Sequence, residues 1–355
     1  MKKRVAIVCG GRSSEHEISC ISAGGVLAAI DRTLYEPVLI GITKSGSWVL
    51  IPDSHSMQIQ GGSLPVVPEN APAVVADVAG FSSAGKALNI DIVFPLLHGP
   101  YGEDGTIQGL LEIADTPYVG SGVLASAVAM DKSFAKPIFA SHGIATAPGI
   151  VVKKSEWDVN KAGVTKEVEA LGLPVFVKPA RGGSSRGTTK VKSIDALAAA
   201  VSEAHRFDPK AMIEKAIIGA EIECAVLEID GVVKASVVGK IHIDSKFEFY
   251  DFEAKYLDGA TSIELPAPID LQTTSRIQES AVKAFQALGC SGLARVDFFV
   301  TPANEVIINE LNTMPGFTAT SVFPKMWAAS GVSYPDVITH LLKSAERRTN
   351  GVLGN

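Results

Sequence analysis

Short apolar segments separated by glycine-rich turns mark the first hundred residues of the chain. Three of them have the length and composition of buried strands: residues 5–9, 37–42 and 91–97. Ser14 and Glu17 have the spacing of a capping box, which predicts a helix that continues to Ile30. Strands that alternate with helices in this way predict an open parallel sheet of the α/β class. Ligands of such sheets gather beyond the carboxyl ends of the strands.

The pattern changes after residue 120, where helices are followed mainly by strands. Helices are predicted at residues 123–130, after Asp131 and, with a clear amphipathic pattern, at residues 276–288. Further strands are predicted at residues 174–178, 188–192, 211–215, 224–229 and 232–238. Asp230 and Gly231 are typical of a hairpin turn between the last two strands. This part of the chain is therefore expected to form mixed or antiparallel sheets, which is the α+β class.

Two segments follow neither a helical nor a strand period. Residues 52–89 are rich in Gly, Pro, Ser and Ala, which predicts a loop-rich insertion. Residues 241–262 mix aromatic and charged side chains, as expected of a lid loop. With 355 residues, and at about 150 residues per domain, the chain is expected to fold into two or three domains.

Composition narrows the class of protein. The chain is 46% hydrophobic and 20% charged, which is typical of globular proteins and excludes disordered and collagen-like chains. A net charge of −6 argues against a nucleic-acid partner. The four cysteines are scattered, which suits a reducing compartment, and no apolar run approaches the roughly 20 residues needed to span a membrane. We therefore expect a soluble cytoplasmic protein without a membrane partner.

The most informative segment is a predicted hairpin that covers residues 291–312. If its turn centres between residues 303 and 304, Asp297 lies opposite Glu310, and Arg295 lies opposite Asn312. Opposed side chains are about 5 Å apart, so two carboxylates there need a cation between them. Two carboxylates and an amide oxygen suit Mg²⁺ bound together with substrate phosphates. The alternative is a solvated strand face that carries an ordinary Arg–carboxylate pair.

Two glycine-rich segments are candidate phosphate sites. Residues 181–187 follow Lys178 and resemble a phosphate-covering loop, although an ordinary flexible hairpin explains them equally well. Residues 120–125 match a dinucleotide-binding fingerprint, which would indicate an oxidoreductase. No acidic residue stands about 20 positions further on to bind a ribose, so a tight helix start is the preferred interpretation.

Three further candidates stand beside turns or helix starts. Glu15 lies beside the first glycine turn, where it could bind an ammonium group, although the helix dipole alone also favours a carboxylate there. His98 opens a loop in which glycines alternate with acidic residues after a predicted parallel strand. Lys132 begins a predicted helix, where a cation opposes the dipole and suggests a partner anion.

Seven motifs follow one another along nearly the whole chain. They are Gly-Gly-x-Ser-x-Glu-x-Glu-Ile-Ser (10–19), His-Gly-x-x-Gly-Glu-Asp-Gly-x-x-Gln-Gly (98–109), Met-Asp-Lys (130–132), Val-Lys-Pro (177–179) with Gly-Ser-Ser (183–185), Tyr-Asp-x-x-Ala-Lys-Tyr (250–256), Ala-Arg-Val-Asp (294–297) and Asn-Glu-x-Asn-Thr-x-Pro-Gly (309–316). In these motifs and their order the chain resembles the D-alanine–D-alanine ligase family of the ATP-grasp superfamily.

The resemblance implies a three-domain ATP-grasp architecture with ATP held between the second and third domains. It implies an N-terminal parallel α/β domain (1–120), a central domain (121–213) and a C-terminal domain (214–347) that carries the lid loop at about 241–262. The ATP phosphates would contact Lys132, Lys178 and Lys255. Adenine would lie along Glu214, Lys215, Ala216 and Ile217, with Glu221 on the ribose. Mg²⁺, or Mn²⁺ in its place, would bind Asp297, Glu310 and Asn312.

The resemblance also implies an activity and its substrate site. The enzyme would join two D-alanines through a D-alanyl phosphate for peptidoglycan precursor synthesis. Glu15 would bind the first ammonium group and form a hydrogen-bonded set with Ser184 and Tyr256 that closes the lid. The remaining substrate residues are Arg295 and Gly316 at the oxyanion, Ser321 at the second carboxylate, and His98. D-Serine or D-lactate as acceptor, or another carboxylate–amine ligase, are the alternatives. The oligomeric state stays open, with a homodimer as the candidate.

Overall fold

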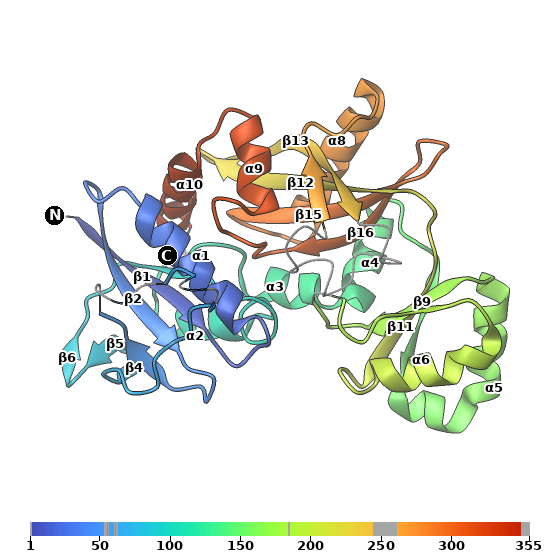
Figure 1. The fold of residues 1–355 in the computed structure, drawn as a ribbon, viewed down its shortest axis with the longest axis horizontal. Helices are drawn as coiled ribbons and strands as arrows, with labels where there is room; N and C mark the ends of the chain where they lie inside the picture. Colours follow the sequence, from blue (N-terminus) through green and yellow to red (C-terminus); the bar gives the residue numbers. More distant parts are fainter. Residues whose placement is uncertain are drawn as a thin grey trace.

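The computed structural model describes residues 2–52, 55, 57–59, 61, 63–183, 185–243 and 261–348, which form four sheets and the helices around them. Figure 1 shows the N-terminal sheet (blue) on one side, the largest sheet (yellow to red) next to it, and a smaller green unit apart from both. Among the described residues, no helix is both long enough and apolar enough to cross a membrane.

The N-terminal sheet confirms the three predicted strands. Its strand order is β3-β2-β1-β7, from β1 (Lys3–Gly10), β2 (Tyr35–Ile42), β3 (Trp48–Leu50) and β7 (Ile92–Pro95). β1 runs parallel to both β2 and β7, and only the edge strand β3 is antiparallel. Helices α1 (His16–Ala29) and α2 (Thr106–Ile113) complete this unit. The crossover connections place the carboxyl ends of β1 and β7 side by side, where a ligand crevice is expected.

One local expectation in this unit was wrong. Helix α1 begins at His16 with Glu15 at its N-cap and no side-chain cap, so the capping box of Ser14 and Glu17 does not form. Glu17 forms an ion pair with Lys44 instead. The described part of residues 52–89 is rich in loops, as predicted, and also contains the small antiparallel sheet of β4 (Val74–Asp77), β5 (Gly80–Ser83) and β6 (Lys86–Ala87). Gly80 and Gly85 lie at the two turns of this sheet and have positive φ.

The second sheet is a four-stranded antiparallel sheet in the order β10-β9-β11-β8. Its strands are β8 (Gly149–Lys153), β9 (Val175–Pro179), β10 (Thr189–Val191) and β11 (Lys210–Lys215). Helix α5 (Lys154–Leu171), the 3₁₀ turn η1 (Ile194–Ala196) and helix α6 (Leu197–Ala204) accompany it. Apolar side chains of α5 and α6 pack on alternate residues of the strands. The opposite face, which carries Lys178 and Glu214, is left for the cleft described below.

The third sheet is the largest and has the order β14-β13-β12-β15-β16. Its strands are β12 (Ala220–Ile229), β13 (Val232–Ile243), β14 (Thr261–Glu264), β15 (Leu293–Val300) and β16 (Val306–Asn312). Five helices pack near it: α3 (Val123–Met130), α4 (Lys132–Ser141), α8 (Leu271–Ala287), α9 (Val322–Ala329) and α10 (Tyr334–Arg347). Both hairpins predicted from the sequence are present, and all their strands are antiparallel.

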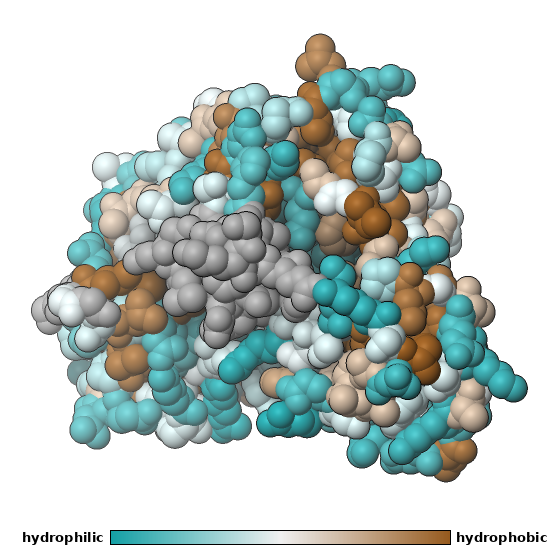
Figure 2. Space-filling view, turned by 45° about the vertical axis from the view of Figure 1, so that its right-hand side comes forward, coloured by the Kyte–Doolittle hydropathy of each residue, from teal (hydrophilic) through white to brown (hydrophobic). Residues whose placement is uncertain are grey.

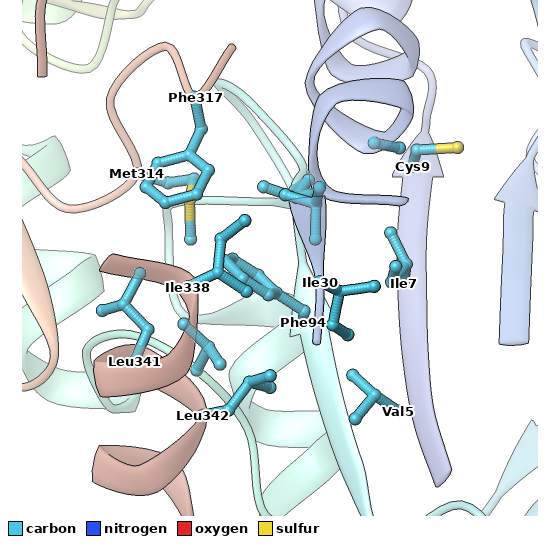
Figure 3. Packing of buried hydrophobic residues seen from close by; sticks show 14 of the residues in the cluster. Val5, Ile7, Cys9, Ile30, Phe94, Met314, Phe317, Ile338, Leu341 and Leu342 are labelled. Atoms are coloured by element: carbon cyan, nitrogen blue, oxygen red, sulfur yellow. The ribbon is translucent and has the colours of Figure 1, made fainter. Parts of the chain in front are cut away.

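One hydrophobic core joins the first sheet to the third. It contains residues of β1 and β7 together with α10 and the loop after β16. Figure 3 shows Met314 and Phe317 from that loop beside Phe94 of β7 and Ile338 of α10. The rings of Phe94 and Phe317 are 5.5 Å apart, and both side chains are fully buried. On the face seen in Figure 2, by contrast, hydrophilic residues (teal) predominate and hydrophobic residues (brown) form separate groups.

Candidate active site

The hairpin of β15 and β16 brings the predicted polar residues together. Asp297 lies opposite Glu310 and Arg295 opposite Asn312, as predicted. Glu223 of β12 lies opposite Asp297 on the other side, so three carboxylates form a row across adjacent strands. Such a row needs positive charge nearby, because like charges directly opposite one another are destabilising.

A β-bulge, which was not anticipated, produces this register. Near the turn, Phe298 pairs with Ile308 and Val300 with Val306, so the turn centres on residue 303. One extra residue in β16, Asn309, then shifts the pairing and brings Glu310 opposite Asp297. A bulge also lets two consecutive side chains face the same side, and both Asn309 and Glu310 line the cleft.

Arg295 supplies charge for two carboxylates of the row. Its Nε and Nη2 donate to Asp297 Oδ1 and Oδ2 at 2.8 and 2.7 Å, and its Nε lies 3.1 Å from Glu223 Oε2. Asn312 Nδ2 also donates to Asp297 Oδ2, at 3.1 Å. Side-chain exposure is only 16% for Arg295 and 14% for Asp297. The cluster is therefore more buried than the solvated strand face of the alternative, although the Arg–carboxylate pair that the alternative expected is present.

Lysines from two other elements face the row. Lys132, the first residue of α4, places its Nζ 2.9 Å from Glu310 Oε2 and donates to the carbonyl of Gly182 at 2.9 Å. Lys178 of β9 has its Nζ 2.6 Å from Glu214 Oε2 and 3.4 Å from Asn309 Oδ1. Lys132 of α4 and Lys178 of the second sheet thus line one cleft, where each is paired with a carboxylate and could donate to an anionic ligand.

A third lysine, Lys136, was missed by the sequence analysis. It forms an ion pair with Glu214 Oε1, so Glu214 lies between the ammonium groups of Lys136 and Lys178. The signal was available, since Lys136 follows Lys132 by four residues and therefore lies on the same helix face. Glu223 was missed in the same way, two residues after Glu221 on one strand.

Burial and charge act in opposite directions on this cluster. Burial alone would raise the pKa of Glu214, but Lys178 and Lys136 lower it to about 2. Burial lowers the pKa of Lys136 to about 8 in spite of Glu214. For Lys132, burial would also lower the pKa, but the Glu310 carboxylate more than compensates and raises it. Glu214 is therefore ionised at neutral pH and holds two cations inside the protein.

These side chains line a cleft between the second and third sheets that contains about 1050 Å³ of empty space, its open mouth included. Lys215, Ile217 and Glu221 line it as well. The Ala216 amide donates to the carbonyl of Pro174. Glu214, Lys215, Ile217 and Glu221, four of the predicted nucleotide residues, thus line this cleft.

The predicted substrate residues lie at the other end of the site. Gly99 has a φ of +73°, and a Cβ there would lie 2.9 Å from Glu15 Oε2, so the loop after β7 passes directly against this carboxylate. Both ring nitrogens of His98 are engaged, with Met314 O at 3.0 Å and Ser22 Oγ at 3.3 Å. Burial lowers the pKa of His98, so the ring is neutral at pH 7.

Gly316 and Ser321 are neighbours after β16. A Cβ at Gly316 would lie 3.3 Å from Ser321 Oγ, and this hydroxyl accepts from the Thr318 amide at 3.1 Å at the start of α9. Three predicted site residues, Ser184, Lys255 and Tyr256, lie outside the described residues, as does most of the predicted lid. Residues 120–125 begin helix α3, as the simpler interpretation expected.

The chemistry of the donor set suits a hard divalent cation. Asp297, Glu310 and Asn312 offer carboxylate and amide oxygens, which Mg²⁺ prefers, at the end of two paired strands. Both carboxylates already hold protein cations, Arg295 and Lys132. Among the residues that the structure describes, no group of three His, Cys, Asp or Glu side chains could hold a metal. A metal here would therefore depend on the amide and on oxygen atoms from a bound substrate.

Comparison with protein families gives two matches that together cover most of the chain. The family described as "D-ala D-ala ligase N-terminus" matches residues 4–121, and the family described as "D-ala D-ala ligase C-terminus" matches residues 138–343. Residues 122–137, which contain α3 and most of α4, lie between the two matches.

Relatives and solved structures agree with the family matches. The chain is 50% identical to a D-alanine–D-alanine ligase of Paenarthrobacter aurescens over 99% of this chain and 97% of that protein. It is 48% identical to the D-alanine–D-alanine ligase of Kineococcus radiotolerans over 99% of this chain and 98% of that protein. The VanG D-Ala:D-Ser ligase from Enterococcus faecalis is similar in structure, with a TM-score of 0.85 and 37% identity over 97% of this chain and 100% of that one. The D-alanine–D-alanine ligase from Coxiella burnetii is also similar in structure, with a TM-score of 0.83 and 36% identity over 97% of this chain and 94% of that one.

Proposed function

Because the chain belongs to the D-alanine–D-alanine ligase family, we propose that it joins two D-alanine molecules at the expense of ATP, for peptidoglycan precursor synthesis. The observation that carries the proposal is the convergence of Lys132 and Lys178 on the carboxylates of β16 and β11 in one cleft. A cleft with several lysines and a hard-oxygen donor set is what transfer of a phosphoryl group requires.

In this proposal ATP lies between the second and third sheets. Its phosphates contact Lys132, Lys178 and Lys255, and adenine lies along Glu214, Lys215, Ala216 and Ile217 with Glu221 on the ribose. The cleft supports this placement, because it is lined by Lys132, Lys178, Glu214, Lys215, Ile217 and Glu221. The same division of the chain into residues 1–120, 121–213 and 214–347 remains our proposal for its domains.

Asp297, Glu310 and Asn312 are the proposed ligands of Mg²⁺, or of Mn²⁺ in its place. When bound there, the ion would neutralise negative charge on the β- and γ-phosphates. Lys132, whose ammonium group forms an ion pair with Glu310 in this structure, is expected to neutralise phosphate charge as well. Charge neutralisation matters because the attacking group is itself an anion, the carboxylate of the first D-alanine.

The proposed reaction has two steps. A carboxylate oxygen of the first D-alanine attacks the γ-phosphorus, the bond to the β–γ bridging oxygen breaks, and ADP leaves, which gives D-alanyl phosphate. The amine nitrogen of the second D-alanine then attacks the acyl carbon, and phosphate leaves with the electrons of the broken C–O bond while the nitrogen loses a proton. Arg295 and the Gly316 N–H stabilise the oxyanion between these events.

The remaining residues hold the substrates and keep out water. Glu15 binds the ammonium group of the first D-alanine, and Ser321 the carboxylate of the second. Ser184 and Tyr256 join Glu15 in closing the lid, which protects the acyl phosphate from hydrolysis. We place the enzyme in the cytoplasm, where ATP is available and where its four free cysteines stay reduced. The homodimer remains a prediction that sedimentation analysis would test.

Product analysis tests this proposal. The chain is incubated with ATP, Mg²⁺ and an equal mixture of D-alanine, D-serine and D-lactate, and the products are identified by mass spectrometry. We expect D-alanyl-D-alanine and ADP in equal amounts as the main products. D-Alanyl-D-serine as the main product would instead support the second candidate, which the similarity to the VanG D-Ala:D-Ser ligase favours. Absence of ADP formation with any of these acids would refute both.

A further inference from the structure

The peptide group of Met314 is held at both ends by one distant loop. His98 Nδ1 lies 3.0 Å from the Met314 carbonyl oxygen, and the Met314 amide donates to Glu103 Oε1 at 3.1 Å. Because a carbonyl oxygen only accepts, the His98 Nδ1 must carry the proton, and Nε2 then accepts from the Ser22 hydroxyl. Two side chains that precede Met314 by more than 200 residues thus fix one peptide plane.

The loop that provides these side chains is itself rigidly held. Glu103 Oε2 accepts from the Gly99 amide at 2.8 Å, and the amides of Gly102 and Glu103 both donate to the Gly99 carbonyl. His98 is 5% exposed and Ser22 is fully buried. Burial raises the pKa of Glu103 to about 8. Residues 98–103 therefore form a fixed support rather than a mobile loop.

Met314 lies between two parts of the proposed site. Asn312, two residues earlier, is a proposed metal ligand, and Gly316, two residues later, is the proposed oxyanion donor. The Met314 side chain is anchored in the core beside Phe94 and Ile338 (Figure 3). On the other side of the clamp, Gly99 lies against Glu15. One support thus touches the backbone near the proposed oxyanion donor and beside the proposed ammonium site.

We propose that His98 and Glu103 are positioning residues for acyl transfer, which clamp the Met314 peptide so that the oxyanion donor and the first substrate's ammonium site keep a fixed separation. The inference rests on the proposed function and deepens it. His98 then acts on the substrate through Met314 and not as a direct ligand, since both of its ring nitrogens bind the protein. Glu103, which the sequence analysis did not single out as a site residue, has an equal share in the clamp.

The clamp predicts a specific defect when it is weakened. A displacement of about 1 Å at a positioning element can cost about 100-fold in rate. Phosphoryl transfer depends on the lysine cluster and would continue, whereas attack by the second amine needs the oxyanion donor in place. The acyl phosphate would then have a longer lifetime, and more of it would be hydrolysed. Loss of the clamp should therefore uncouple phosphate release from dipeptide formation.

Glu103→Gln is the first test, because glutamine keeps the shape but can accept only one of the two amides. We expect dipeptide formation to fall about 10- to 100-fold, the KM for ATP to stay within about twofold, and several phosphates to be released per dipeptide. Glu228→Gln is the matched control, since Glu228 also bridges two elements, accepting from the Gly292 amide and the Ser344 hydroxyl, away from the cleft. It should keep one phosphate per dipeptide.

His98 gives a second and independent test. His98→Asn keeps a donor near the position of Nδ1, whereas His98→Leu removes it, so we expect the first variant to retain most of the coupling and the second to lose it. Hydrogen exchange of residues 313–316 without ligands should be faster in Glu103→Gln than in the parent. Tight coupling and unchanged exchange in Glu103→Gln would overturn the clamp. A parent chain that forms no dipeptide would refute the proposed function, while the exchange result would still decide the clamp.

Discussion

Replacing Glu214 with glutamine tests the electrostatics of the cleft most sharply. The substitution keeps the size of the side chain but removes the charge that lies between Lys136 and Lys178. Two ammonium groups, one of them 5% and the other 13% exposed, would then face each other without a counter-charge. Breaking a buried ion pair by removing one partner costs about 3–5 kcal/mol.

This loss of free energy can be measured as a decrease in the melting temperature, Tm. At about 2.1 cal/mol/K per residue, unfolding of this chain carries an entropy of roughly 0.75 kcal/mol/K. A loss of about 3–5 kcal/mol should therefore lower Tm by about 4–7 °C, measured by calorimetry without nucleotide at pH 7. Glu203→Gln is the matched control, because Glu203 pairs with Arg206 at the surface, where both side chains are well exposed. Its Tm should change by less than about 1 °C.

The loss of stability in Glu214→Gln should depend on pH, and a second substitution should partly reverse it. Because the folded pKa of Lys136 lies near 8, below the usual value of 10.5, its burial penalises the folded state most below pH 8 and less as the pH rises toward 10. The deficit of Glu214→Gln should therefore shrink between pH 7 and pH 10. Adding Lys136→Met should recover at least about 1 kcal/mol. A Tm equal to that of Glu203→Gln, or no recovery in the double variant, would refute the reasoning.

Three further predictions follow from other parts of the structure. Asp297→Ala should abolish ligation, because it removes the carboxylate that Arg295 and Asn312 hold; unchanged phosphate release with ATP and D-alanine would contradict its role. Phe94→Ala should cost about 3–5 kcal/mol of stability, whereas the exposed Leu124→Ala should cost less than about 0.5, as denaturant unfolding would measure. Since the folded pKa of Glu214 is depressed from 4.5 to about 2, its contribution is present above pH 4.5 and is lost as the pH falls toward 2, so the Tm difference between parent and Glu214→Gln should narrow in acid.

Strand pairing was the feature that the sequence predicted best. Alternation along the segments of β15 and β16 is strict enough to put Asp297 and Glu310 opposite each other, and they are. The reason for the register was different, because a bulge at Asn309 and a turn centred one half-residue earlier give the same pairing. A bulge depends on local backbone geometry, and nothing in the alternation of side chains signals it.

Groups that act across long sequence separations were harder to predict. Lys136 and Glu214 are 78 residues apart, and only the packing of α4 beside the second sheet brings them together. In the sequence, Glu103 is one of several acidic residues among glycines, and its proposed role depends on the Met314 amide 211 residues away. Helix α1 begins at His16 without the predicted capping box, and Glu17 pairs with Lys44 of another element rather than with its own helix end. Local patterns thus predicted elements and single strands, while tertiary contacts determine which charges meet.

The fate of the carboxylate oxygens of D-alanine tests the central claim most directly. D-Alanine with both carboxylate oxygens replaced by ¹⁸O is incubated with the chain, ATP and Mg²⁺, and the released phosphate is analysed by mass spectrometry. Attack of the carboxylate on the γ-phosphorus predicts one ¹⁸O atom in each phosphate that accompanies a dipeptide. Dipeptide formed together with unlabelled phosphate would contradict the acyl phosphate, and with it the role assigned to the lysine and carboxylate cleft.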